Sequence, residues 1–257
     1  MHCAKLLTYP VDTVYLYDGS PAGFYCCMHE SVYEKEMPLA VHRQDASQRT
    51  MLPTKTIHTN EEKAQRVRTA VSEKISLRIQ QLVDTVFFSC LPEKEIALMN
   101  FLHTAFKTGP AFIDMLAHHE VSPLLKAEKH LLGERHLLTG FIRFVEDEGT
   151  LVSTISPKNY ILPFISGHFA ERFHNERFII YDKTHKAGLF HKDGELQIIP
   201  LSDVEFGRVS EKEAMLQALW RRFYDTIAIQ SRINPKCRMS HMPKRYWENM
   251  TELSDEV

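Results

Sequence analysis

The chain has 257 residues, of which 44% are hydrophobic and 25% are charged, and its net charge is −2. This composition is typical of a globular protein that can bury a substantial core, and it excludes an overall polycation. No apolar run approaches the roughly 20 residues that cross a bilayer. The first residues also lack a long apolar segment followed by a cleavage site, so we expect a cytoplasmic protein without membrane contact.

The sequence has no motif of a familiar cofactor or metal site. None of the five cysteines belongs to a C-x-x-C pair, and the fourteen histidines show neither His-x-x-x-His nor H-E-x-x-H spacing. A P-loop, G-x-G-x-x-G and G-x-S-x-G are also absent, so nucleotide hydrolysis, dinucleotide binding and serine acyl transfer lack support. We therefore predict neither a metal nor a cofactor.

The N-terminal part of the chain indicates a strand followed by a helix. Residues 14–17 are β-branched and aromatic, and Asp18-Gly19 forms a turn after them. Ser20-Pro21 then provides a helix cap with proline in the first turn. Residues 38–41 are typical of a second short strand.

A helical block follows at about residues 60–136. Apolar residues recur there at the three-and-four spacing of a helix with one buried face. Gly109-Pro110 interrupts the pattern. The predicted helices cover residues 61–71, 72–90, 92–107, 111–119 and 122–136.

The next region, about residues 137–200, predicts a ββαββ module. Two β-branched and aromatic runs, 140–146 and 151–155, flank a glycine-containing turn. Residues 160–173 have helical periodicity, with Pro163 in the first turn. A second hairpin is predicted from 177–182 and 187–191, and Asp193-Gly194 leads into a last strand at 195–199.

These elements define an α+β fold, because strands and helices are segregated and do not alternate regularly. We predict a single domain over residues 1–257. It would consist of an antiparallel ββαββ sheet module packed against the helical block, with an N-terminal strand and helix and a C-terminal helix.

The C-terminal block, residues 208–247, carries nine lysines and arginines against three acids. Ser210 to Glu213 forms a capping box that begins a helix, and its apolar side is predicted to be buried. Cations interleaved with aromatic residues are typical of a surface that neutralises phosphates and stacks on bases. The alternative is that the aromatic residues anchor the C-terminus and the charges are only solvated. The candidate contacts are Arg221, Arg222, Arg232, Lys244, Arg245, Tyr246 and Trp247.

Three further arginines, Arg143, Arg172 and Arg177, come from neighbouring predicted elements joined by short turns. Because such short connections keep elements adjacent, their guanidinium groups are expected along one edge of the module. Converging guanidinium forks suit phosphate. The alternative is that Glu171, Glu176 or Asp182 pairs with them at the rim of the core.

Acid–base chemistry has three candidate residues: Asp18, His136 and His168. Each also has a structural interpretation. Asp18 lies in a turn, where a carboxylate accepts backbone hydrogen bonds. His136 lies at a predicted helix end, where an imidazole can bond to the last carbonyls.

Several short motifs are spread over nearly the whole chain: Tyr17-Asp-Gly-Ser20 with Gly23-Phe24, Glu134-x-His136, Gly140-Phe-x-Arg143-Phe144, His168-Phe-x-x-Arg172-Phe, Asn175-Glu-Arg177, Leu219-Trp-Arg-Arg-Phe223 and Met242-Pro-Lys-Arg-Tyr-Trp247. Together they resemble the bacterial DUF4130 family, described as probable DNA metabolism proteins. In that family the domain occurs beside a radical-SAM protein or fused to a uracil-DNA-glycosylase-like domain. The three-cysteine motif of radical-SAM enzymes is absent here, so the resemblance implies the companion of such an enzyme.

The leading hypothesis is therefore a DNA-binding accessory protein in DNA repair or modification, acting with a radical-SAM or glycosylase-like partner. One alternative is an enzyme that acts on a DNA base or lesion. Another is a protein-binding adaptor without direct DNA contact.

Overall fold

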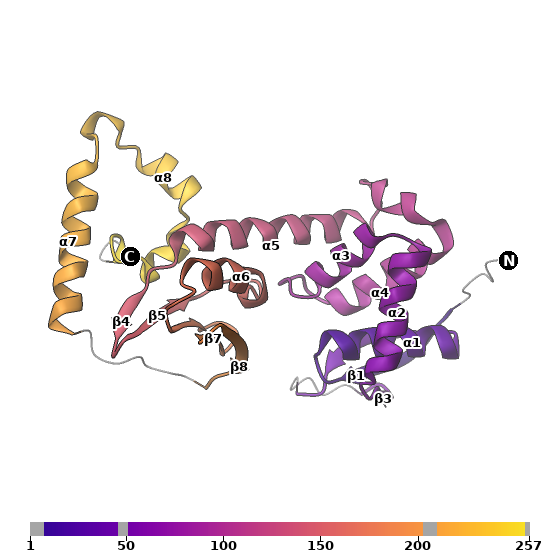
Figure 1. Cartoon of the computed structure of the whole chain (residues 1–257). Helices are drawn as coiled ribbons and strands as arrows, with labels where there is room; N and C mark the ends of the chain where they lie inside the picture. The colour runs from indigo at the N-terminus through magenta and orange to yellow at the C-terminus, as the bar shows by residue number, and fades with distance from the viewer. Residues whose placement is uncertain (1–7, 46–50, 203–209, 255–257) are drawn as a thin grey trace. The chain divides into compact units, whose positions relative to one another are not determined.

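The computed structural model describes residues 8–45, 51–202 and 210–254. The fold is α+β, as predicted, with helices and two sheets (Figure 1). The chain divides into two compact units, Met1–Leu131 and Leu132–Val257, and each is described by itself. The single domain expected from the sequence stays a prediction.

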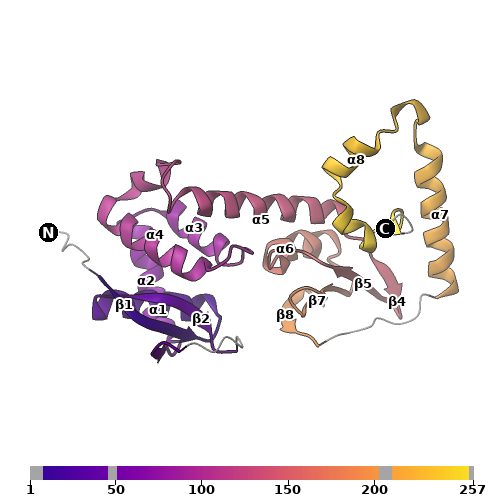
Figure 2. The ribbon, with the colours of Figure 1, turned by 180° about the vertical axis from the view of Figure 1, so that it is seen from behind.

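The N-terminal unit contains a small parallel sheet and a group of helices. Its strands have the spatial order β2-β1-β3, and both strand pairs are parallel. Helix α1 packs on β1 and β2 (Figure 2). The third strand has no apolar pattern that would have predicted it. The elements are β1 (Tyr9–Tyr17), α1 (Pro21–Glu34), β2 (Glu36–Arg43), β3 (Thr54–Thr56), α2 (Glu61–Lys74), α3 (Leu77–Val86), α4 (Lys94–Thr108), the 3-10 helix η1 (Pro110–Asp114) and the first part of α5 (Ser122–Phe141).

Side-chain caps mark the beginnings of α1, α2 and α3. The Ser20 hydroxyl accepts a hydrogen bond from the Gly23 N–H at 2.9 Å and caps α1, as predicted. Ser76 caps α3 in the same way, through the Ile79 N–H at 3.1 Å. Because of this cap, the helix predicted over 72–90 is divided: α2 reaches Lys74 and a new helix begins at Leu77.

One continuous apolar core holds the N-terminal unit together. It combines strand β1 with the inner faces of helices α1 to α4, and its members are almost fully buried. Burial of this kind is the main stabilising contribution to folding. The largest side chains with no more than 1% exposure include Tyr15, Tyr17, Phe24, Phe101 and Phe112.

The C-terminal unit is built around a five-stranded sheet with the order β4-β5-β6-β7-β8. Helix α6 packs on β7 and β8, and α7 and α8 follow the last strand along the chain (Figure 1). The elements are the end of α5, β4 (Val145–Asp147), β5 (Thr150–Ile155), α6 (Leu162–Arg172), β6 (Phe178–Asp182), β7 (Ala187–Lys192), β8 (Glu195–Pro200), α7 (Glu211–Ile227), the 3-10 helix η2 (Gln230–Arg232), α8 (Pro235–His241) and the 3-10 helix η3 (Lys244–Asn249).

The sheet is mixed, so the predicted antiparallel module was wrong at one strand pair. Strands β5 and β6 run parallel, with Leu151 opposite Phe178. Their connection passes through α6, and a helical crossover brings the chain back to the same end of the sheet. The pairs β4–β5, β6–β7 and β7–β8 are antiparallel.

The strand predicted over 140–146 was also mostly wrong. Helix α5 continues to Phe141, and β4 begins only at Val145. Leu131, Leu138 and Ile142 are buried at a helical spacing of seven and four residues. This apolar stripe favours helix over the sheet propensity of the phenylalanines.

Helix α7 begins after Ser210, whose hydroxyl accepts a hydrogen bond from the Glu213 N–H at 3.1 Å. Its apolar side is exposed, contrary to the prediction from periodicity. Leu216 is 47% exposed and Phe223 is 51% exposed. Arg208, the first cation of the predicted basic block, lies outside the described residues.

Across the described ranges, no helix is both long and apolar enough to span a membrane.

Candidate nucleic-acid interface

A cluster of phenylalanines positions two of the predicted arginines. The Phe144 ring lies 5.5 Å from Phe169, 5.0 Å from Phe173 and 6.1 Å from Phe178, centroid to centroid. Arg143 and Arg172 each precede one of these rings in the sequence, so packing of the rings fixes the backbone that carries both arginines. Both line a cleft of about 490 Å³, which helix α7 borders with Trp220.

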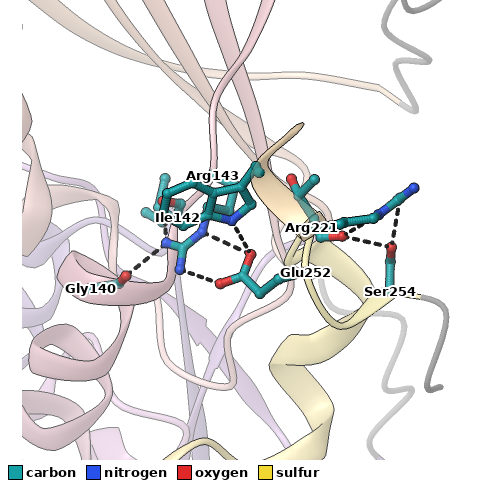
Figure 3. A network of polar contacts seen from close by, with 8 residues as sticks. Gly140, Ile142, Arg143, Arg221, Glu252 and Ser254 are labelled. Atoms are coloured by element: carbon teal, nitrogen blue, oxygen red, sulfur yellow. Dashed lines mark hydrogen bonds and ion pairs between the residues drawn. The ribbon is translucent and has the colours of Figure 1, made fainter. Parts of the chain in front are cut away.

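Arg143 is held by partners within the protein (Figure 3). Its Nη2 donates to Glu252 Oε1 at 2.6 Å, and its Nε donates to Oε2 at 3.2 Å. The Nη1 group donates to the carbonyl oxygens of Gly140 and Ile142 at 2.8 and 3.2 Å. Most of the N–H groups of Arg143 are therefore committed to the protein, as in the carboxylate-pairing alternative.

Glu252 is the buried centre of this network. Its side chain is 2% exposed, and it also accepts a hydrogen bond from Trp220 Nε1 at 3.0 Å. Desolvation opposes its ionisation, but the hydrogen bonds from Arg143 and Trp220 outweigh it and lower the pKa of Glu252. The charged pair thus attaches the segment around Glu252 to the end of α5, and the Trp220 hydrogen bond attaches α7 to the same carboxylate.

Arg221 makes a second attachment to the same C-terminal segment. Its Nε donates to the Thr251 carbonyl at 2.8 Å, and its Nη2 lies 3.5 Å from Ser254 Oγ (Figure 3). Arg221 and Arg143 line a second cleft of about 290 Å³. Both arginines therefore have a structural role whether or not they contact a ligand.

Another buried carboxylate, Glu134 on α5, was not predicted as a site residue although it belongs to the Glu134-x-His136 motif. Its side chain is 1% exposed. Desolvation opposes its ionisation, but the backbone N–H groups of Asn159 and Lys158 lower the pKa of Glu134. Its five donors are Lys158 N (3.1 Å), Asn159 N (2.8 Å), Asn159 Nδ2 (2.6 Å), Arg245 Nη2 (3.0 Å) and Tyr246 Oη (3.0 Å).

Tyr246 and Trp247 belong to the core of the C-terminal unit. They are 3% and 2% exposed, and burial raises the pKa of Tyr246 to about 12. Trp247 Nε1 donates to the Met242 carbonyl at 2.8 Å. Because buried rings cannot stack on bases, the proposed contact surface excludes both aromatic residues, together with Arg245, which pairs with Glu134.

The remaining predicted contacts are exposed: Arg172, Arg177, Arg222, Arg232 and Lys244. Arg172 lies over the Phe173 ring, and Lys244 lies over Trp247, at 5.5 and 5.4 Å from the ring centroids. No ion pair joins these five to a carboxylate in the part of the chain that the structure describes. Arg177 precedes β6 and does not line either cleft.

The three acid–base candidates belong to different units, His136 and His168 to the C-terminal unit and Asp18 to the N-terminal one. His136 and His168 are exposed, on α5 and α6, and neither lines the two clefts. The His168 ring contacts Phe169 edge-on at 4.9 Å. Asp18 belongs to the N-terminal unit and lines a cavity there. Within the described ranges, no three histidine, cysteine or acidic side chains are placed to hold a metal ion.

These features define an α+β protein whose C-terminal segment is attached through buried carboxylates and exposes cations. The chain belongs to the DUF4130 family, a domain of unknown function, which matches residues 92–252. That range contains both buried carboxylates and the exposed arginines. No curated protein and no solved structure matches the chain.

Proposed function

We propose that the protein binds DNA as a non-catalytic accessory module in DNA repair or modification. The observation that carries this proposal is the cationic segment, residues 222–244, in which lysines and arginines accompany a single acid, Asp225. Four of these cations are exposed: Arg222, Arg232, Lys236 and Lys244.

Exposed cations of this kind favour a polyanion by a known mechanism. Each phosphate that a lysine or arginine neutralises releases condensed counterions from DNA, so affinity falls steeply with salt. Trp220 and Phe223 are 41% and 51% exposed on α7, where aromatic faces can stack on unpaired bases. They replace the buried Tyr246 and Trp247 as the candidate stacking residues.

A charge-matched pair of variants tests this proposal. One variant changes Arg222, Arg232, Lys236 and Lys244 to Gln, and its control changes four other exposed lysines, Lys126, Lys129, Lys158 and Lys192. Fluorescence anisotropy with labelled DNA over a salt series should show weaker binding for the first variant. Its slope of log affinity against log salt should become shallower by about 0.9 for each phosphate that the variant no longer neutralises.

The control should keep most of the slope, although its net charge changes equally. An equal decrease of the slope in both variants would show that the overall charge of the protein, and not this segment, causes the effect. An unchanged slope in the first variant would remove the cationic segment from the interface.

A second function, docking of a partner protein, is favoured by the apolar face of α7. Met215, Leu219 and Ile227 are 63%, 51% and 57% exposed, in line with Leu216, Trp220 and Phe223. Contiguous exposed apolar groups typically mark interaction sites. The family resemblance suggests a radical-SAM or uracil-DNA-glycosylase-like protein as the partner.

Co-elution with the purified product of a neighbouring radical-SAM reading frame tests this second function. Leu219→Ser combined with Phe223→Ser should abolish co-elution, whereas the four-residue cationic variant should preserve it. If the cationic variant loses co-elution and the double serine variant keeps it, charged residues and not the apolar face make the contact.

A further inference from the structure

The N-terminal unit contains a cavity of about 560 Å³ bordered by α1, α2 and α3. All its lining residues precede residue 92, so the cavity lies outside the part of the chain that defines the family. One wall is aromatic and consists of Phe24, Tyr25 and Phe87, which are 1%, 3% and 6% exposed, and the half-buried Phe88. Phe87 lies 5.7 Å from Phe24 and 5.3 Å from Phe88, so the rings form one apolar surface.

The polar lining of the cavity carries an excess of negative charge. Its carboxylates are Asp18, Glu61 and Asp84, and its one cation among the lining residues is Arg68. Arg68 Nη2 donates to Asp84 Oδ2 at 2.8 Å, and Tyr25 Oη donates to Oδ1 at 2.8 Å. Asp84 is thus neutralised internally, whereas no lining cation remains for Asp18 and Glu61.

Asp18 is held in a fixed orientation at the mouth of the cavity. Its Oδ1 accepts hydrogen bonds from Ser20 N at 2.9 Å and Ser20 Oγ at 2.7 Å, and its Oδ2 accepts one from Thr59 Oγ1 at 2.7 Å. Desolvation alone would raise the pKa of Asp18, but these hydrogen bonds lower it, so the group is ionised at neutral pH. Because a carboxylate oxygen can accept two hydrogen bonds, Oδ2 retains capacity for a ligand donor.

Gly23 makes this placement possible. A Cβ atom at position 23 would lie 2.2 Å from Asp18 Oδ1 and 2.9 Å from Thr59 Oγ1, too close for any side chain. The glycine in the first turn of α1 therefore allows the carboxylate to approach the helix, which gives the Tyr17-Asp-Gly-Ser20 and Gly23-Phe24 motif a physical reason.

An aromatic wall beside uncompensated carboxylates suits a positively charged ligand with an apolar body. The aromatic wall favours burial of an apolar body, and the carboxylates attract an ammonium group beside it. An anionic ligand would meet the charges of Asp18 and Glu61. The volume lies within the range of roughly 300–1,000 Å³ that is usual for small-molecule sites.

We propose that this cavity binds a small organic cation, with its apolar body against the half-buried Phe88 and its ammonium group toward Asp18 and Glu61. The site shares no residue with the DNA contact proposed above, so either can fail without the other.

Titration calorimetry of the full chain with three ligands of similar shape tests the inference. The probes are 2-phenylethylammonium, the neutral 2-phenylethanol and the anion 3-phenylpropionate. We expect the ammonium compound to bind about tenfold tighter than the alcohol and the anion to bind most weakly. Equal affinity for the three compounds, or no binding of the ammonium compound, would overturn the proposal.

Substitutions of single carboxylates test which of them causes the preference for the ammonium compound. Asp18→Asn retains the acceptor for Ser20 and removes the charge, so it should weaken ammonium binding and leave the alcohol unaffected. Glu61→Gln should act in the same direction. Glu62→Gln is the matched control, because Glu62 is the next residue of the same helical turn and does not line this cavity.

Gly23→Ala tests whether the position of the Asp18 carboxylate matters, because it displaces Asp18 and leaves its charge in place. Ammonium affinity should fall while net charge stays constant. If the changes at positions 18 and 23 prevent folding, the exposed Glu61 and the half-buried Phe88 still provide the test through Glu61→Gln and Phe88→Leu. Ammonium affinity that is unchanged in both of these would contradict the site.

Discussion

The two units differ in how the apolar faces of their helices are covered. In the N-terminal unit the apolar faces of α1 to α4 meet in one buried cluster. In the C-terminal unit the segment after α7 is attached through two buried carboxylates, Glu134 and Glu252, while the apolar face of α7 remains exposed. Helical periodicity therefore predicts that a helix forms, but it does not predict what covers the apolar face.

The largest expected effect distinguishes two phenylalanines with opposite surroundings. Phe101 has no exposed surface and stacks on Phe112 at 5.4 Å, whereas Phe223 is 51% exposed. Phe101→Ala should lower the free energy of unfolding by about 3–5 kcal/mol, because it removes buried area and leaves a cavity. Phe223→Ala should cost less than about 1 kcal/mol. Urea denaturation of both variants provides the measurement, and similar costs would show that α7 is covered in solution.

The second expected effect concerns the polar attachment in the C-terminal unit. Glu134→Gln replaces one acceptor oxygen by an N–H donor group and leaves Arg245 without its counter-charge. The variant should lose about 2–3 kcal/mol in the free energy of unfolding. The control is Glu248→Gln: its ion pair with Lys183 is exposed, so its removal should cost less than about 1 kcal/mol.

The pH dependence of this effect has a definite sign. The folded pKa of Glu134 lies below its unfolded value of about 4.3, so the unfolded state binds more protons in acid. The contribution of Glu134 is complete above the unfolded pKa and is lost as the pH falls through the folded one. Glu134→Gln should therefore show a shallower loss of stability in acid than the parent protein does, and parallel curves would contradict the assignment.

The smallest expected effect concerns His103, one of the buried polar side chains of the N-terminal unit. His103 is 3% exposed, its Nε2 lies 2.9 Å from Ser31 Oγ, and burial followed by the charge of Lys107 lowers its pKa to about 4. Since the unfolded pKa is about 6.5, the unfolded state gains a proton first as the pH falls. Stability should be complete above about pH 6.5 and lower by about 2 kcal/mol near pH 5. In His103→Gln this decrease should be absent in denaturation curves recorded at the two pH values.

Local signals in the sequence predicted much of the fold. Caps such as Ser20 and Ser210, and the tight turn at Asp193-Gly194, correctly predicted where α1, α7 and β8 begin. Parallel pairing of β5 and β6 could not be derived in this way, because strand direction depends on how the helical crossover packs. The three-residue strand β3 gains its hydrogen bonds from β1 and has no apolar pattern of its own.

Only part of the candidate site could be predicted from the sequence. Short connections predicted that Arg143, Arg172 and Arg177 lie along one edge; Arg143 and Arg172 line one cleft, and Arg177 does not. The partner of Arg143 was not predicted, because Glu252 is distant from Arg143 in the sequence. Glu134 could have been found as a carboxylate within an apolar helical stripe, where only a buried and paired acid is tolerated.

The continuity of α5 has a practical consequence for dissecting the protein. The division after Leu131 falls inside this helix, which runs from Ser122 to Phe141. A protease needs a locally unfolded substrate, and a recombinant fragment cut at the division would leave the ends of a helical turn without hydrogen-bond partners. Fragments that begin at Ser122 or end after Phe141 keep the helix whole and are the better choice for separate expression.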